Sequence, residues 1–491
     1  MTWGTDVTYL AATNIKGRVV PFGIKDADRT HHVCVLGKVG SGRSAFLSRM
    51  ALQDIERGVG VLVLDGSGNV GPMIMERLPK NAIEHLAFVD AADAEYPFSW
   101  NIPNEFRHSA RGEELWLRAF ASAYGVEQSA FTDVLARWVL ADPSRTLVHA
   151  WFALETPQAT AAAFTEGSPD AELLRAAEQA APDARAEFIE RGKYVAKDTL
   201  VRNILGQPDG KFSLRSLANG GICIVDLSRI RVFPTRVQPL VRLFAYAFRA
   251  HAADNAVPAA YFHDVLRYLS ADDADALMTD RSYALTLSDT VYRESDVPLR
   301  ERALKRCGSV VAFEPDESDV PLVQQLFYPY LGADELKGLD AGEACVFLTI
   351  DAVRSNPFFA ASLPLQERTQ TSLQDMIVGA RAAYAEPRSK VEELFAKKEK
   401  PKDSGKPPPF SDAFKNIMAK RDPTNFIAPS AATQAGTAPP QPQPEKELPA
   451  PEKKDASKSS EPITTPPVPE EKKELSEDEL RALLSAGPIP A

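Results

Sequence analysis

Short runs of apolar residues alternate along the chain with longer stretches in which apolar residues recur every three or four positions. The short runs, rich in Val, Ile and Leu, predict β-strands, and the longer stretches predict amphipathic helices. Because strands that alternate with helices are typical of a parallel sheet covered on both faces, the pattern predicts an α/β fold. The expected strands are residues 33–36, 59–65, 85–90, 222–227, 259–262, 283–289, 309–313 and 344–350.

The same pattern divides the chain into regions. Residues 106–201 are rich in alanine and have helical spacing throughout, which predicts an all-helical insertion between the third and fourth strands. The core then consists of residues 1–105 and 202–386. Beyond it the periodicity fades, and 18 of the 38 prolines lie from Pro401 onward. A segment that is rich in Pro, Lys and Glu buries little apolar surface, so residues 387–474 are predicted to be a disordered linker.

Residues 475–487 carry the end signals of a helix. Ser476 is a candidate N-cap with Glu479 three residues on, and Gly487 is a candidate stop. The helix would present a leucine stripe of Leu480, Leu483 and Leu484. We expect it to dock on a partner or back on the body of the protein, and the alternative is a helix that binds nothing.

Composition narrows the class of protein. With 491 residues, 44% hydrophobic and 25% charged, the chain is of ordinary globular composition. Its formal net charge of -11 disfavours a broad nucleic-acid surface, although contact through a pore or a few loops stays open. The four cysteines form no CxxC pair and are predicted to be reduced. We see neither a membrane span nor a signal peptide, and expect a cytoplasmic protein that reaches the inner membrane only through partners.

Residues 37–44, Gly-Lys-Val-Gly-Ser-Gly-Arg-Ser, follow the first expected strand and precede a helical pattern. Glycines in such a loop let backbone N–H groups surround phosphate oxygens, and the helix N-terminus adds its positive end. Arg43 stands where a phosphate loop usually has lysine, and Ser44 remains available to a magnesium ion. The predicted nucleotide-binding residues are Gly37, Lys38, Val39, Gly40, Ser41, Gly42, Arg43, Ser44 and Ala45.

The strand 59–65 ends in Asp65, and no glutamate follows it. In RecA-like proteins another strand separates the phosphate loop from the strand that carries the metal-binding acid, so we expect that strand later in the sequence. Asp65 is then a strand-end residue near the site and a candidate magnesium ligand.

At this point the chain resembles a known family. Residues 8–44, 59–69, 200–228 and 339–364 are similar to the type IV secretion coupling proteins (TraD/TraG-like), which are ATPases of the HerA and FtsK superfamily. The resemblance covers most of residues 8–386, and the helical insertion corresponds to the family's all-alpha domain. It implies a RecA-like P-loop core that binds ATP and Mg2+. It also implies a hexameric ring of identical or related P-loop subunits, a role in DNA transport, and a secretion-channel or relaxase-like partner for the C-terminal tail.

The sequence departs from the family's pattern at its catalytic positions. The family's Asp-Glu pair is replaced by His263 and Asp264, and histidine is a poor magnesium ligand. The polar sensor position falls on Thr290, and the position of the expected arginine falls on Glu314, which reverses the charge.

Two hypotheses follow from these departures. The first is a pseudo-ATPase, a subunit or adaptor that binds nucleotide but hydrolyses little, because each altered group stabilises the transition state of phosphoryl transfer. The alternative is an active ATP-driven DNA translocase in which neighbours compensate. Lys38 would then cover for Arg43, and Asp65 or Asp264 would hold magnesium.

Overall fold

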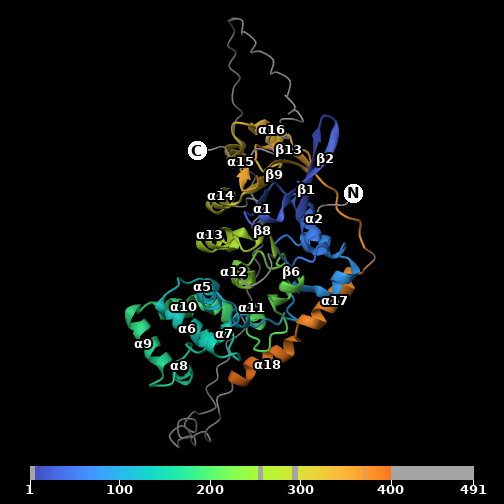
Figure 1. Ribbon diagram of the computed structural model, residues 1–491. Coiled ribbons are helices and arrows are strands. Elements are labelled where there is room, and N and C mark those ends of the chain that lie inside the picture. Colours follow the sequence, from blue (N-terminus) through green and yellow to red (C-terminus); the bar gives the residue numbers. More distant parts are fainter. Residues whose placement is uncertain (1–5, 253–257, 290–296, 370, 400–491) are drawn as a thin grey trace, which may run out of the picture. The chain divides into compact units, whose positions relative to one another are not determined.

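A computed structural model describes residues 6–252, 258–289, 297–369 and 371–399 (Figure 1). Its described residues form an eleven-stranded sheet and a separate two-stranded hairpin of β11 (Thr349–Ile350) and β12 (Val353–Arg354). The strands of the large sheet are β1 (Val7–Ile15), β2 (Arg18–Lys25), β3 (Val33–Leu36), β4 (Val61–Asp65), β5 (Leu86–Asp90), β6 (Ile222–Asp226), β7 (Ala259–His263), β8 (Ala284–Asp289), β9 (Ser309–Phe313), β10 (Glu343–Phe347) and β13 (Phe358–Ser362).

The strand order is β2-β1-β13-β10-β9-β3-β8-β7-β4-β6-β5. All neighbours from β9 to β5 pair in parallel, whereas β10, β13, β1 and β2 extend the sheet with antiparallel pairs. The predicted α/β fold with a mostly parallel sheet is confirmed. The sheet is larger than predicted, because β1, β2 and β13 were not among the expected strands.

Helices cover both faces of the sheet. The helical segments are α1 (Asp26–Arg29), α2 (Arg43–Glu56), α3 (Val70–Met75), η1 (Lys80–His85), α4 (Pro103–Phe106), α5 (Gly112–Tyr124), α6 (Ala130–Ala141), α7 (Leu147–Phe152), α8 (Pro157–Ala163), α9 (Pro169–Ala180), α10 (Ala184–Ala196), α11 (Thr199–Leu205), η2 (Leu214–Asn219), α12 (Pro234–Ala252), η3 (Leu266–Tyr268), α13 (Ala271–Thr279), α14 (Val297–Arg306), α15 (Val320–Phe327), α16 (Ala333–Lys337), α17 (Leu373–Tyr384) and α18 (Arg388–Glu399). None of these is long and apolar enough to cross a bilayer within the described ranges.

Successive strand residues point to opposite faces, and this divides the interior into two cores. In β3, Val33 and Val35 belong to the core that contains α2 and α3, and Cys34 and Leu36 belong to the core that contains α12 and α13. Every residue of β3 is buried, which explains why the sequence reads as a continuous apolar run. The four cysteines are buried, and none of them forms a disulfide bond.

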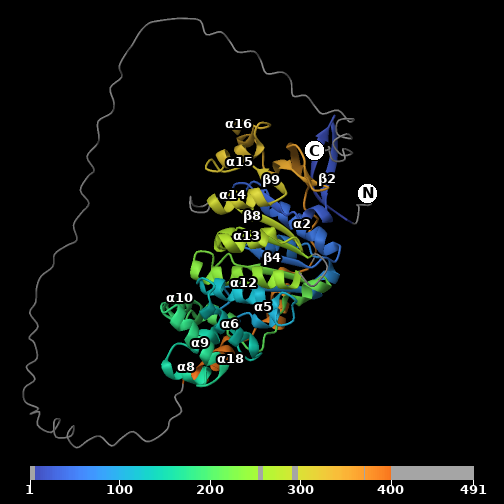
Figure 2. The ribbon, with the colours of Figure 1, turned by 60° about the vertical axis from the view of Figure 1, so that its left-hand side comes forward.

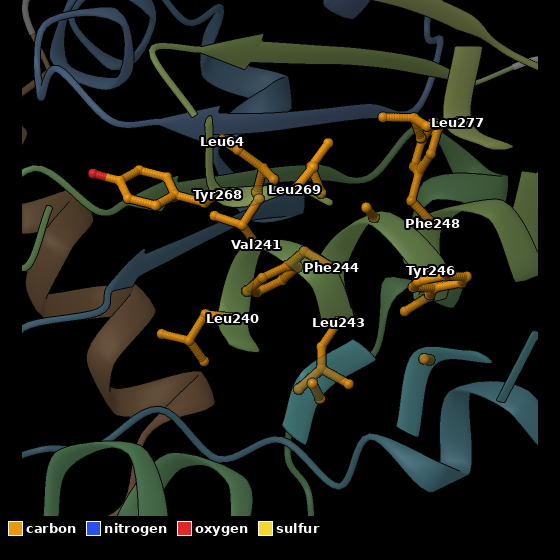
Figure 3. Close-up of a cluster of buried hydrophobic side chains, with 14 of the residues drawn as sticks. Leu64, Leu240, Val241, Leu243, Phe244, Tyr246, Phe248, Tyr268, Leu269 and Leu277 are labelled. Atoms are coloured by element: carbon orange, nitrogen blue, oxygen red, sulfur yellow. The ribbon is translucent and has the colours of Figure 1, made fainter. Parts of the chain in front are cut away.

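Helices α4 to α11 lie between β5 and β6 in the sequence and gather at one end of the molecule (Figure 2). Helix α12 packs between this insertion and the sheet. In Figure 3, Val241 lies toward Leu64 of β4, whereas Leu243 points to the opposite side, where the insertion passes. The core of the insertion is therefore continuous with one core of the sheet.

The last described helices cover one sheet edge and then reach the insertion. Helix α17 packs on β5, and α18 packs on α11, where the Arg202 guanidinium lies 4.5 Å from the centre of the Phe395 ring. The linker was predicted to begin at residue 387, and this boundary is wrong by about one helix. Val391 and Phe395 of α18 are both buried, because they lie four residues apart on one helix face. The predicted terminal helix 475–487 lies outside the described residues.

A buried ion pair ties α1 to α2. The Arg29 guanidinium donates to both carboxylate oxygens of Asp54, at 2.6 and 2.9 Å, and Tyr261 of β7 donates to the same carboxylate. Burial alone would raise the pKa of Asp54, but the charge of Arg29 overcomes it and the pKa is lowered. Asp54 is fully buried, so its charge depends on these partners.

Asp54→Asn should therefore lower the free energy of unfolding by about 3–5 kcal/mol, because it leaves the buried Arg29 guanidinium without its counter-charge. Urea unfolding measures the change. The matched control is Asp351→Asn, which breaks the exposed Lys25–Asp351 ion pair and should leave the free energy of unfolding nearly unchanged. Equal effects of the two substitutions would contradict a special role for the buried pair.

Candidate nucleotide site

The loop of residues 37–42 joins β3 to α2 at the carboxyl end of the parallel strands. Strand β8 lies between β3 and β7, so β7 stands one strand removed from the loop. This is the position that RecA-like proteins give to the metal-binding acid, as the sequence predicted, and β7 ends in His263. The strand order and the loop define a RecA-like P-loop NTPase fold.

The loop has the backbone of a phosphate cradle. Gly40 and Gly42 have φ angles of 86° and 110°, which side chains with a Cβ rarely adopt. Helix α2 begins directly after Gly42, so the free N–H groups of its first turn face the loop. Val39 at the loop tip is 75% exposed.

The chain itself holds the loop from two sides. The Lys38 N–H donates to the Glu314 carbonyl oxygen at 2.8 Å, and the Gly342 N–H donates to the Ser41 carbonyl oxygen at 3.0 Å. The side chains of Lys38 and Glu314 also form an ion pair. Lys38 is therefore paired with Glu314, the residue at which the sequence reasoning had expected an arginine.

Arg43 does not extend along the loop. Its side chain is 5% exposed and its Nη1 donates to Asp264 Oδ1 and to Ser288 Oγ, both at 3.0 Å. Burial alone would raise the pKa of Asp264, but the charge and hydrogen bond of Arg43 oppose it, so the pKa is lowered and the carboxylate stays ionised. The residue that replaces the loop lysine thus forms a buried ion pair with the residue that follows β7.

The backbone conformation at Asp264 is unusual. Asp264 has a φ of 53°, in the left-handed region that few residues other than glycine adopt. A Cβ on Gly66 of the neighbouring loop would lie 2.5 Å from the Asp264 carbonyl oxygen, so only glycine fits there. Aspartate adopts this region more readily than most other residues, and the hydrogen bond from Arg43 fixes the direction of its side chain.

His263 and Ser44 contact each other directly. His263 Nε2 lies 3.1 Å from Ser44 Oγ, and the imidazole is 1% exposed. Burial lowers the pKa of His263, the Asp264 carboxylate opposes the change, and Arg43 reinforces it. The imidazole is therefore neutral near pH 7. The hydroxyl that would bind magnesium in a P-loop protein is hydrogen-bonded to histidine here.

Asp65 has a structural role. Its Oδ1 accepts hydrogen bonds from the Ser67 N–H, the Ser67 hydroxyl and the Gly68 N–H, and its Oδ2 accepts one from the Gly71 N–H. These bonds form the turn from β4 into α3. Three of the four bonds fall on Oδ1 and one on Oδ2, so the turn orients this carboxylate, and the magnesium role of Asp65 stays a prediction.

Thr290, the predicted sensor residue, lies outside the described residues. The residue before it, Asp289, was missed by the sequence reasoning. It ends β8 and pairs in register with Leu36, the last residue before the phosphate loop. Burial, reinforced by the Asp264 carboxylate, raises the pKa of Asp289 to about 7, against the opposing charges of Arg267, Arg43 and Arg300. The sequence did offer one signal for Asp289, which is that an acidic residue ends the expected strand 283–289.

A scan of family models gives no match, and no curated protein matches. Among solved structures, the chain is similar to the plasmid coupling protein TrwB in complex with ADP and Mg2+, with 14% identity over 73% of this chain and 91% of that one and a TM-score of 0.49. It is also similar to VirB4 of Thermoanaerobacter pseudethanolicus, with 12% identity over 75% of this chain and 97% of that one and a TM-score of 0.44. At these identities no residue role is carried over.

The pH dependence of stability tests the charge state of Asp289. Because its folded pKa is above the unfolded value, its contribution to stability is full below about pH 4 and is lost as the pH rises through about 7. Asp289→Asn has no proton to lose. The free energy of unfolding of the variant minus that of the wild type should therefore be roughly 2–3 kcal/mol larger at about pH 8 than at about pH 5. Urea unfolding of both proteins at both pH values measures this difference. The same difference at about pH 5 and about pH 8 would contradict the raised pKa of Asp289.

Proposed function

We propose that this chain is a coupling-protein-like P-loop subunit of a type IV secretion or conjugation apparatus, and that it binds nucleotide but hydrolyses it weakly or not at all. The observation that carries the proposal is the buried ion pair between Arg43 and Asp264. This pair engages two groups that phosphoryl transfer would need, the Arg43 cation at the end of the loop motif and the Asp264 carboxylate next to the end of β7.

The remaining catalytic positions favour the same conclusion. P-loop ATPases hold the metal through the loop hydroxyl and an acidic strand residue, and an arginine stabilises the charge of the transition state. Here the strand residue is the neutral His263, and Glu314 stands where the arginine is expected and pairs with Lys38. Loss of an arginine finger alone lowers the rate of hydrolysis by ~10³–10⁵-fold.

Support for nucleotide binding comes from the loop backbone. The glycine conformations at Gly40 and Gly42 and the start of the 14-residue helix α2 are the features that bind phosphate oxygens without side chains. A Cβ at Gly40 would meet no atom within 4 Å, so the loop tip is open to a ligand.

The proposal extends to assembly and partners. The resemblance of residues 8–386 to coupling proteins supports a homo-hexamer or a hetero-hexamer with related P-loop subunits. In the hetero-hexamer an active relative would supply hydrolysis. DNA and a secretion-channel or relaxase-like protein are the proposed partners, the latter through the C-terminal tail. The protein would be cytoplasmic and would reach the inner membrane through these partners.

DNA-stimulated ATP hydrolysis by the full-length chain tests this function. We expect turnover no higher than that of a Gly42→Asp variant, in which a side chain against Gly342 and a φ of 110° would disturb the loop backbone. A triple variant with Arg43→Lys, His263→Asp and Glu314→Arg restores the three altered positions. It should hydrolyse ATP faster than the unmodified chain if the remaining fold is competent.

Clear turnover by the unmodified chain that the Gly42→Asp variant lacks would contradict the pseudo-ATPase. It would establish the alternative, an active translocase whose site uses compensating residues. Circular dichroism of both variants controls for loss of fold.

A further inference from the structure

The oxygen atoms that a magnesium ion requires are engaged elsewhere in this site. Magnesium demands near-octahedral oxygen coordination and, in P-loop proteins, takes the loop hydroxyl together with an acidic strand residue. In this chain the loop hydroxyl of Ser44 is hydrogen-bonded to His263, and an imidazole nitrogen is a poor substitute for the carboxylate oxygen that magnesium prefers.

Three carboxylates lie near the loop, and one of them, Asp289, is buried at the end of β8. Asp264 is ion-paired with Arg43, and Asp65 accepts four hydrogen bonds in the turn before α3. In the described ranges no group of three or more His, Cys, Asp or Glu side chains is arranged to hold a metal ion. The residues present therefore do not fit the ion that the fold family implies.

A cation is already present at the site. The Arg43 guanidinium is almost fully buried between the end of β7 and Ser288 of β8. Its Nε is buried without a hydrogen-bond partner in the described part of the chain, so it keeps an unused donor. A divalent ion beside this guanidinium would add like charge in a place where the available carboxylate is neutralised.

We propose that this site binds a nucleoside di- or triphosphate without a divalent metal ion, through the N–H groups of the phosphate loop and of the first turn of α2, while Arg43 stays paired with Asp264. The inference rests on the nucleotide binding in the proposed function. It adds that the phosphates are held by the backbone of the loop, so that affinity does not depend on magnesium.

Calorimetric titration of the full-length chain with ADP, and separately with a non-hydrolysable ATP analogue, tests the inference. Each titration is run in excess Mg2+ and in EDTA. We expect dissociation constants that agree within about twofold between the two conditions, whereas a metal-dependent site would lose tenfold or more in EDTA.

The same titrations on two variants give a second measurement. The variants are His263→Asp and, as its control, His263→Asn, because asparagine has nearly the shape of aspartate without its charge. The aspartate adds an oxygen ligand and a negative charge beside Ser44, so it should create a magnesium-dependent gain in affinity of about tenfold or more. The asparagine adds an oxygen without the charge and should remain insensitive to magnesium. Thermal unfolding shows whether both variants are folded.

The outcomes separate this inference from the proposed function. Equal affinity in Mg2+ and EDTA supports the inference. Binding by the unmodified chain only in Mg2+ overturns it and leaves the nucleotide-binding pseudo-ATPase intact. Absence of binding under both conditions overturns the inference together with the nucleotide-binding half of the proposed function. If either variant fails to fold, the comparison on the unmodified chain decides alone.

Discussion

The candidate site depends on one interaction, the buried ion pair between Arg43 and Asp264. A buried charge without its partner costs about 3–5 kcal/mol, so each of these residues requires the other. The pair connects the first residue of α2 to the residue after β7, and Ser288 adds the intervening strand β8 through its hydroxyl. The Arg43 guanidinium therefore links three elements that meet at the phosphate loop.

This interaction changes the electrostatics of an otherwise ordinary P-loop fold. An active site keeps its lysine free for phosphate and its carboxylate free for metal. Here both charges cancel inside the protein, His263 is neutral, and Lys38 is paired with Glu314. The backbone cradle is retained while the side chains that drive hydrolysis are engaged with one another. The arrangement favours a subunit that recognises nucleotide without consuming it.

Much of this architecture could be predicted from the sequence. The parallel strands are buried on both faces and read as unbroken apolar runs, as in β3, so their alternation with helices identifies the fold. Strand β2 was missed because it is an edge strand with exposed residues and contains Pro21 and Gly23. The direction of Arg43 could not be predicted, because its partners lie 221 and 245 residues away in the sequence. The raised pKa of Asp289 likewise depends on burial that only the folded chain creates.

The most direct test of this account is a crystal structure of the full-length chain grown with a non-hydrolysable ATP analogue and Mn2+, with the anomalous signal of manganese measured at the loop. The account predicts phosphate density against the N–H groups of residues 40–44, the Arg43–Asp264 contact retained, and no manganese peak at Ser44. A manganese peak on the Ser44 hydroxyl, with Arg43 turned onto the phosphates, would contradict it.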